Sequence, residues 1–331
     1  MLRQVEGRLG HLTLNRPERI NALDLDTIAA VGVGLADWAT DPAVELVLID
    51  GAGERGLSAG GDLRALYEAM AGQGLPPSEF WAREYEVNAT IAHFAKPVVA
   101  IMDGIVFGGG VGISAHARVR VVTERSLVAM PETAIGLYPD VGALYLLARA
   151  PGEFGTHAAL TGARLDAAQA IHAGLADMMV PVAQLPGLVR SLQAGRLPEA
   201  AGPPGAGSSP APIGHSDWID AAYRFDTVPE IIAALAAHSE PAAAQALQTL
   251  RAMSPTSLAV TLAGIRRART LSLDEVLEQD IRVCARFLDH PDLREGIRAQ
   301  IIDKDRRPRW NPAELADVDP ADVAGFFAPL R

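Results

Sequence analysis

Residues 96–142 read KPVVAIMDGIVFGGGVGISAHARVRVVTERSLVAMPETAIGLYPDVG, and the rest of the chain is best interpreted outward from this stretch. The apolar, β-branched run at residues 98–102 predicts a buried strand. Glycines occupy positions 108–110, where we expect a helix to begin and to continue over residues 111–117. The first N–H groups of a helix have no acceptor inside it, and the helix dipole adds partial positive charge there. This place therefore suits a phosphate or the oxyanion of an acyl-transfer intermediate.

Two carboxylates follow the glycines, after a strand-like segment that ends at residues 127–130. Glu132 lies next to the apolar pair Met130–Pro131, so it is either a solvated turn residue or a partly desolvated acid or base. Asp140 precedes the helical pattern VGALYLL and can serve simply as its N-cap. Backbone donors for an oxyanion and two carboxylates thus share one stretch of sequence.

A second glycine turn, Gly60–Gly61–Asp62, ends the loop after an earlier strand pattern. Asp62 can cap a helix over residues 63–70, which would turn the Gly61 N–H toward a groove. A well-capped loop with no further role is the alternative. Acyl transfer needs two converging N–H donors, and Gly61 and Gly109 are the two glycine-exposed helix starts of this chain.

Two other patterns suggest chemistry less strongly. GAGERG at residues 51–56 matches the dinucleotide-binding pattern, but the following helix begins only at Asp62, so we interpret it as a plain loop. Ser114 and His116 could suggest a nucleophile and its base, but no G-x-S-x-G surrounds the serine and the register fits a helix interior.

Composition excludes several classes of function. The 331 residues carry a net charge of −11 and only two lysines, Lys96 and Lys304, which argues against broad binding to nucleic acids or anionic membranes. The single cysteine, Cys284, excludes an internal disulfide and gives no metal-ligand spacing. Because a strand pattern begins at residues 8–15 and no apolar run approaches the roughly twenty residues of a membrane span, we expect a cytoplasmic protein.

Strand and helix patterns alternate over the first part of the chain, which is typical of an α/β fold with mostly parallel pairing. Strands are predicted at residues 8–14 and 44–50. Helices are predicted at residues 24–39, 63–70, 79–94, 153–160 and 166–173.

Residues 197–214 read LPEAAGPPGAGSSPAPIG, which is typical of a flexible linker or surface loop. Beyond it the patterns are helical throughout, at residues 228–238, 241–253, 257–268, 273–288 and 292–301. We therefore expect a first domain at residues 1–195, a linker at 196–215 and an α-helical region at 216–331.

Four motifs, in this order, resemble the enoyl-CoA hydratase/isomerase (crotonase) superfamily over residues 8–182: LNRPERINAL at 14–23, LSAGGDL at 57–63, KPVVAIMDGIVFGGGVG at 96–112 and MPETAIGLYPDVG at 130–142. Three motifs of the tail extend the resemblance to the 3-hydroxyisobutyryl-CoA hydrolase branch: AMSPTSL at 252–258, HPDLREGIRAQIIDKDRRPRW at 290–310 and NPAEL at 311–315. The resemblance implies a crotonase-like spiral of ββα turns in the first domain, which would bind an acyl-CoA, followed by an α-helical C-terminal region.

The resemblance also assigns roles to residues. The thioester oxygen would be held by the N–H groups of Gly61 and Gly109, in agreement with the interpretation of the two glycine turns as N–H donors. Glu132 falls on the catalytic glutamate of the family, and Asp140 falls on the aspartate that this branch adds. Glu84 matches a further glutamate that contacts the substrate.

Gly112 stands where enoyl-CoA hydratases carry a second glutamate. Hydration of a C=C bond needs two carboxyl groups around one water, so this position favours hydrolysis over hydration. Departures from the hydrolase pattern are small: Ala143 replaces a usual glycine and Ser58 a common cysteine.

The expected reaction is hydrolysis of a 3-hydroxyacyl-CoA, with Glu132 as nucleophile or general base and no metal or redox cofactor, CoA being part of the substrate. A Δ-enoyl-CoA isomerase that uses Glu132 alone and a non-catalytic CoA-ester-binding protein are the alternatives. Arg16 and Arg19 are candidates for the CoA phosphates. Relatives form trimers or hexamers, whereas a tail folded over its own active site would suit a monomer.

Overall fold

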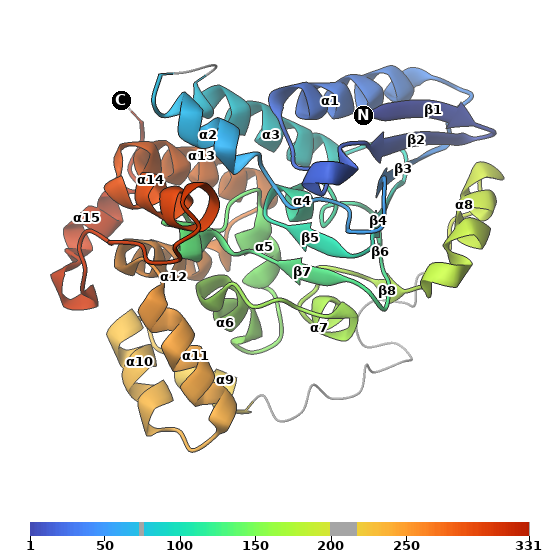
Figure 1. Cartoon of the computed structure of the whole chain (residues 1–331). Helices are drawn as coiled ribbons and strands as arrows, with labels where there is room; N and C mark the ends of the chain where they lie inside the picture. The colour runs from blue at the N-terminus through green and yellow to red at the C-terminus, as the bar shows by residue number, and fades with distance from the viewer. Residues whose placement is uncertain (73–75, 199–216, 331) are drawn as a thin grey trace. The chain divides into compact units, whose positions relative to one another are not determined.

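The computed structural model describes residues 1–72, 76–198 and 217–330 (Figure 1). The chain divides into two compact units. Unit 1 comprises Met1–Asp62, Ala82–Ala129 and Arg164–Ile213, and unit 2 comprises Leu63–Trp81, Met130–Ala163 and Gly214–Arg331. The units interleave along the chain, so residues 130–163 group with the C-terminal helices. The predicted domain limits stay predictions, and the predicted linker, 196–215, lies outside the described residues from residue 199 onward.

Unit 1 is built on a six-stranded sheet with the order β1-β2-β3-β4-β6-β8. The first pair is antiparallel and every other neighbouring pair is parallel, which confirms the expected pairing. The strands are β1 (Leu2–Glu6), β2 (Leu9–Leu14), β3 (Leu46–Gly51), β4 (Val98–Met102), β6 (Val119–Val122) and β8 (Met178–Met179).

Helix α1 (Leu25–Thr40) covers one face of this sheet. It begins at Asp24, whose side chain accepts a hydrogen bond of 2.9 Å from the Thr27 N–H, as the sequence predicts. Near its other end the Trp38 ring lies on β2, where a Cβ at Gly10 would come within 2.5 Å of the ring. Lys96 closes the helix by donating to the carbonyl oxygens of Trp38 (2.5 Å) and Asp41 (2.6 Å).

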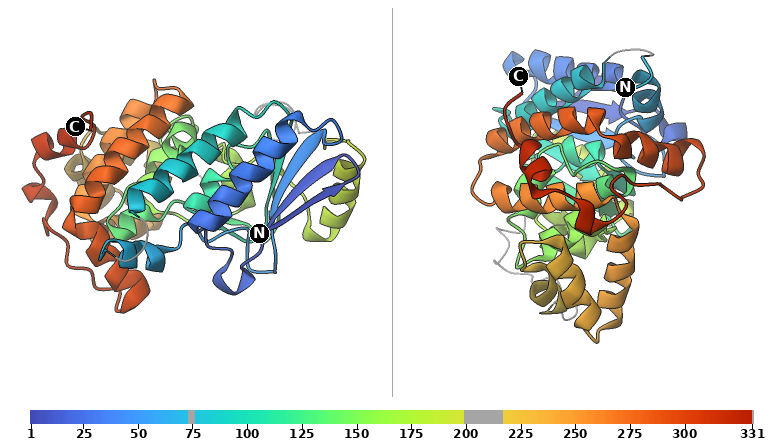
Figure 2. Two further views of the ribbon diagram at one scale, coloured as in Figure 1. Left: turned by 90° about the horizontal axis from the view of Figure 1, so that it is seen from above. Right: turned by 90° about the vertical axis from the view of Figure 1, so that its left-hand side faces the viewer.

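Helix α8 (Leu185–Gln193) covers the opposite face, so that the sheet lies between α1 and α8 (Figure 2, left). Sequence reasoning missed this helix, because it lies close to the Pro- and Gly-rich segment and its apolar face is short. Leu192 is fully buried in the sheet side chains, and three partly buried residues extend the contact: Leu185, Leu188 and Val189.

Two further strands, β5 (Ile105–Phe107) and β7 (Leu127–Ala129), form a small parallel sheet in unit 1. Helix α4 (Gly109–Gly112) follows β5 and is one turn long. The expected continuation of this helix over residues 111–117 is wrong, because the chain proceeds in turns from Ile113. Ser114 competes with the helix, since its hydroxyl donates a 2.6 Å bond to the Gly110 carbonyl.

Unit 1 also holds α7 (Ala167–His172) and most of α3 (Pro77–Ala92). The described elements of unit 2 are helical, and the predicted tail helices are confirmed. The elements of unit 2 are α2 (Leu63–Ala69), η2 (Glu132–Ile135), α5 (Ala143–Leu147), α6 (Phe154–Thr161), α9 (Asp217–Tyr223), α10 (Val228–Ala237), α11 (Pro241–Ala252), α12 (Pro255–Ala268), α13 (Leu273–Asp289), α14 (Pro291–Ile297), η4 (Arg298–Ile302), η5 (Leu315–Asp317) and α15 (Pro320–Gly325).

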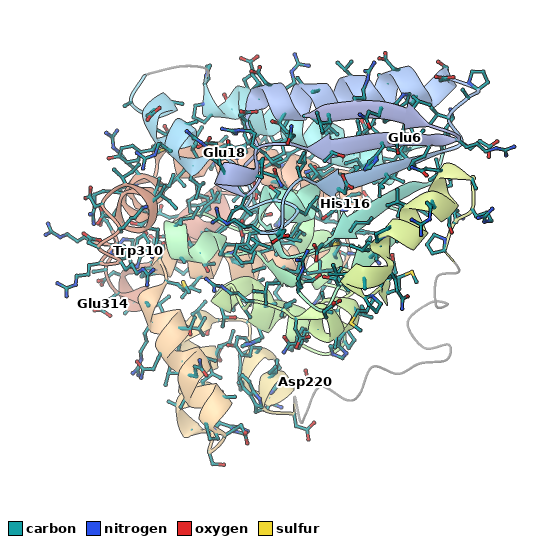
Figure 3. The ribbon with its side chains drawn as sticks, turned by 45° about the vertical axis from the view of Figure 1, so that its right-hand side comes forward. Glu6, Glu18, His116, Asp220, Trp310 and Glu314 are labelled. Carbon is teal, nitrogen blue, oxygen red and sulfur yellow. The ribbon has the colours of Figure 1, made fainter. Side chains whose placement is uncertain are left out.

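The segment between α14 and α15 runs over the end of α11, where Trp310 donates a 3.1 Å bond to the Ala252 carbonyl (Figure 3). Among the described helices of both units, none is long and apolar enough to cross a membrane.

Leu192→Ala should lower the free energy of unfolding by about 2–5 kcal/mol, because it leaves a cavity where α8 meets the sheet. Arg190→Ala, at an exposed position of the same helix, should change it by no more than about 0.5 kcal/mol. Urea denaturation of both variants checks this, and equal effects would contradict the packing described for α8.

Candidate active site

The turn that carries Gly60 and Gly61 lies directly against β5 and the start of α4. Ser58 donates to the Ile105 carbonyl at 3.1 Å and accepts from the Phe107 N–H at 3.0 Å through its own carbonyl. Gly60 has φ +93°, and a Cβ there would lie 2.9 Å from Phe107 O and 3.3 Å from the backbone nitrogen of Gly109. Only glycine allows this approach, which places the two predicted donor turns side by side in unit 1.

Hydrogen bonds to Leu23 fix the direction of the Gly61 N–H. Leu23 donates to the Gly60 carbonyl and accepts from the Asp62 N–H, both at 2.8 Å, in a parallel bridge opposite Gly61. In this pattern the N–H of Gly61 itself faces away from Leu23. Gly109 is the first residue of α4, so its N–H has no acceptor within that helix.

Glu84 on α3 reaches the same place. Its side chain is 2% exposed, and its Oε1 fills the space that a Cβ on Gly109 would need. One turn further along α3, the fully buried Asn88 can donate 3.2 Å bonds to the carbonyls of Gly112 and Glu84 when its amide nitrogen faces them. The structure therefore brings Gly61, Gly109 and Glu84 together within unit 1.

Glu132 belongs to unit 2, where it opens the 3₁₀ turn η2. Its side chain is 6% exposed, so the interpretation as a solvated turn residue is wrong. The next residue anchors the turn, because the Thr133 hydroxyl donates to the Leu160 carbonyl at 3.1 Å and the Thr133 carbonyl accepts from the Ser254 N–H at 3.3 Å. Helix α6 and the start of α12 thus fix the backbone beside Glu132.

Helix α14 holds the other side of this turn through two glycines that sequence reasoning did not single out. A Cβ on Gly136, at φ +72°, would overlap the backbone of Asp292. A Cβ on Gly296 would overlap the backbone of Ile135. Gly136 in PETAIG and Gly296 in REGIR are the sequence features that allow this contact. They can be recognised as such only once the two segments are known to meet.

Asp140 is also buried, at 5% exposure, in unit 2. The interpretation as a helix cap is wrong: Gly142 is the N-cap of α5, and no side chain caps that helix. The Asp140 carboxylate instead lies 3.7 Å from the Sγ of Cys284, which can donate to it. Its own carbonyl accepts from the Ala143 N–H at 2.8 Å.

The two arginines considered for CoA phosphates differ in their surroundings. Arg16 is committed to Asp24 (2.9 Å), Asp62 (3.2 Å) and the Ala22 carbonyl (2.8 Å). Arg19 contacts Asp62 at 3.2 Å and leaves 54% of its side chain exposed. Arg16 therefore holds its loop in place, and Arg19 is the better candidate for an external phosphate.

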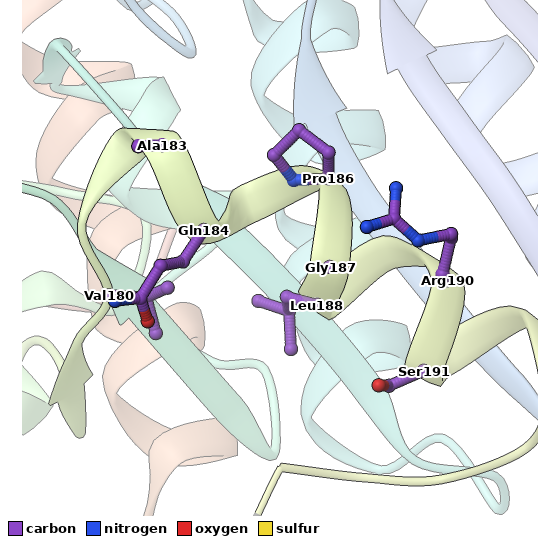
Figure 4. A pocket seen from close by; sticks show the side chains of 8 residues that line it. All are labelled: Val180, Ala183, Gln184, Pro186, Gly187, Leu188, Arg190 and Ser191. Atoms are coloured by element: carbon purple, nitrogen blue, oxygen red, sulfur yellow. The ribbon is translucent and has the colours of Figure 1, made fainter.

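Two other features of unit 1 lie outside the predicted catalytic residues. Ser114 is fully buried with its hydroxyl bonded to Gly110, and His116 lies in the turns after α4 (Figure 3). A hollow of about 460 Å³ beside α8 (Figure 4) is lined by residues outside every predicted site: Val180, Ala183, Gln184, Pro186, Gly187, Leu188, Arg190 and Ser191.

Residues 9–327 match the family model described as enoyl-CoA hydratase/isomerase, and the chain belongs to this family, with the crotonase fold. Within it, the mitochondrial 3-hydroxyisobutyryl-CoA hydrolase of Rattus norvegicus is 40% identical, covering 100% of this chain and 89% of its own length. The corresponding protein of Homo sapiens is 37% identical with the same coverage.

Two solved structures share the fold over nearly the whole chain. One, from Mycobacterium thermoresistibile, is titled a carnitinyl-CoA dehydratase; it is 47% identical, with a TM-score of 0.92 over 99% of this chain and 96% of its own. The other, from Rhodobacter sphaeroides 2.4.1, is titled an enoyl-CoA hydratase; it is 44% identical, with a TM-score of 0.92 over 99% and 97%. The names of these relatives therefore point to two different reactions.

Gly109→Ala should destabilise the protein by about 1–3 kcal/mol, because its methyl group collides with the Glu84 carboxylate. Adding Glu84→Ala should recover part of this loss, with a coupling of about 0.5–3 kcal/mol in a double-mutant cycle measured by urea denaturation. Gly187→Ala is the matched control, since its Cβ meets only the tip of Arg190 at 3.9 Å. Additive effects of the two substitutions would contradict the contact between Gly109 and Glu84.

Proposed function

We propose that this protein hydrolyses a 3-hydroxyacyl-CoA thioester, with 3-hydroxyisobutyryl-CoA as the leading substrate, to CoA and the free hydroxy acid. The observation that carries the proposal is the approach of Gly60 to the backbone nitrogen of Gly109, which sets two glycine-exposed turns side by side. Two such donors stabilise the oxyanion that forms when a thioester carbonyl is attacked. The 37–40% identity to proteins named 3-hydroxyisobutyryl-CoA hydrolase supports this choice.

In the proposed mechanism the thioester oxygen accepts from the N–H groups of Gly61 and Gly109. Glu132 then acts in one of two ways. As nucleophile, its carboxylate forms a C–O bond to the acyl carbon, the C–S bond breaks, CoA leaves, and water hydrolyses the mixed anhydride. As general base, it takes a proton from a water whose oxygen forms the C–O bond to the acyl carbon; the C–S bond then breaks and the departing CoA sulfur receives that proton. Glu84 and Asp140 would bind the substrate hydroxyl or position that water.

Hydration is the competing reaction, because two relatives of known structure are titled a dehydratase and a hydratase. Addition of water to a C=C bond requires a second carboxyl group, and the resemblance places that group at Gly112, which has no side chain. This residue favours hydrolysis. Isomerisation by Glu132 alone and CoA-ester binding without turnover, with the helical unit as a partner surface, are the further alternatives.

The proposed reaction is a step of valine breakdown, and we extend the proposal to that role. The names of the animal relatives give a mitochondrial location for those proteins; for this chain a cytoplasmic location is the expectation. A trimer or hexamer, as in relatives, and a monomer are both compatible with the proposal.

A thiol-release assay over a panel of acyl-CoAs tests the function. Release of CoA from 3-hydroxyisobutyryl-CoA supports hydrolysis. Loss of enoyl absorbance without free thiol indicates hydration, and a shifted double bond without free thiol indicates isomerisation. Binding without any turnover would identify a CoA-ester-binding protein, and each of these three results would reject the proposal.

Glu132→Gln should lower kcat for thiol release by about 10²–10⁴-fold, because it removes the nucleophile or base but keeps the side-chain shape. The dissociation constant for the CoA ester should change little. Glu86→Gln, at an exposed position of α3, is the matched control and should leave both values unchanged. Undiminished thiol release by Glu132→Gln would remove this residue from the mechanism.

A further inference from the structure

Helix α13 presents a buried carboxylate to the turn that carries Asp140. Asp280 has no exposed surface. Its Oδ2 accepts a 2.8 Å bond from the Gly142 N–H, and its Oδ1 accepts a short bond from the Tyr138 hydroxyl. One side chain therefore binds the chain on both sides of Asp140, at positions 138 and 142.

The turn between these two bonds has an unfavourable backbone. Val141 has φ +52° and Gly142 has φ +72°, so two consecutive residues are left-handed. A β-branched residue such as Val141 adopts this conformation at a cost of about 1–3 kcal/mol, and surrounding contacts must hold it. The bond from the Gly142 N–H to Asp280 is such a contact.

Two further side chains of α13, Gln279 and Cys284, contact the same turn. Gln279 donates a 3.2 Å bond to the Tyr138 hydroxyl, which leaves that hydroxyl to donate to Asp280. Cys284, one turn further along α13, lies 3.7 Å from the Asp140 carboxylate. Helix α13 thus contacts both the backbone of the turn and the side chain that the turn presents.

A buried carboxyl group in such a place is costly. Burial raises the pKa of Asp280 well above its usual value, although the hydrogen bond from Tyr138 opposes this. Because a buried carboxyl group is tolerated only when it is hydrogen-bonded, the two bonds from the turn are what hold Asp280 in this place, and Asp280 in turn holds them.

We propose that Asp280 is a positioning residue that holds the strained turn at Val141–Gly142 and thereby fixes the Asp140 carboxylate for the reaction. This inference rests on the proposed function, because Asp140 has a task only if the thioester is turned over. A displacement of a reacting group by about 1 Å can cost roughly 10²-fold in rate.

Asp280→Ala should lower kcat for thiol release by about 10²-fold and leave KM nearly unchanged. Asp280→Asn keeps an acceptor for the Gly142 N–H and should recover most of this loss. In an Asp140→Ala background, Asp280→Ala should cost little more, because the group that it positions is already gone. Val276→Ala, at a fully buried position of the same helix, controls for general destabilisation.

Amide hydrogen exchange of the peptide covering residues 137–147 provides a readout independent of turnover. Exchange should be faster in Asp280→Ala, with wild-type protection largely kept in Asp280→Asn and in the Val276→Ala control. If Asp280→Ala fails to fold, the comparison of Asp280→Asn with Tyr138→Phe, which removes one of the two bonds, takes its place.

Full additivity of Asp280→Ala and Asp140→Ala, or unchanged kcat despite lost protection, would overturn the proposal. A wild-type protein that releases no thiol would overturn the proposed function instead. The exchange comparison would then still decide whether Asp280 holds the turn.

Discussion

Close contact between backbones, made possible by glycine, is the constraint on which the candidate site depends. In unit 1 the turn at Gly60 lies so close to the carbonyl of Phe107 and the nitrogen of Gly109 that a Cβ on Gly60 would be crowded by both. A side chain at Gly60 would separate the turn from α4, and the two predicted donors would no longer be neighbours. Strand β5 matters here because its bridge to Ser58 sets the register in which these turns meet.

The same principle operates on the carboxylate side. Gly136 and Gly296 let α14 contact the backbone of the Glu132 turn. On α12, a Cβ at Gly264 would lie 2.7 Å from the Tyr138 ring, so the absence of a side chain lets the ring approach this helix. Helices of the C-terminal region thus act on the two acidic turns through backbone contacts and through Asp280. Within unit 2 the tail therefore holds the backbone of both acidic turns in place.

Much of the fold could be predicted because its signals are local. Strand β4 reads as five buried apolar residues, α1 begins at a capping aspartate, and the tail helices carry clear periodicity. Helix α8 and the short length of α4 could not be predicted, because they depend on packing against the sheet and on the Ser114 bond to Gly110.

The candidate site likewise has features that could be predicted from the sequence and features that could not. Gly61, Gly109, Glu132 and Asp140 could be singled out by residue type and spacing, and the resemblance adds Glu84. The burial of Glu132 and the failure of Asp140 to cap α5 required the structure, because both depend on segments far away in the sequence. The cluster around Asp280 could not be predicted for the same reason. Asp280 accepts a hydrogen bond from the N–H of Gly142, which lies 138 positions earlier in the sequence.

The bonds that close α1 have a consequence for a protein exposed to activated acyl groups. Thioesters acylate unprotonated amines, and the chain carries two lysines among its 331 residues. The Lys96 ammonium group donates to the carbonyls of Trp38 and Asp41, so its nitrogen is held against the end of α1. Adventitious acylation of lysine by the substrate would therefore fall chiefly on Lys304, near the far end of the sequence.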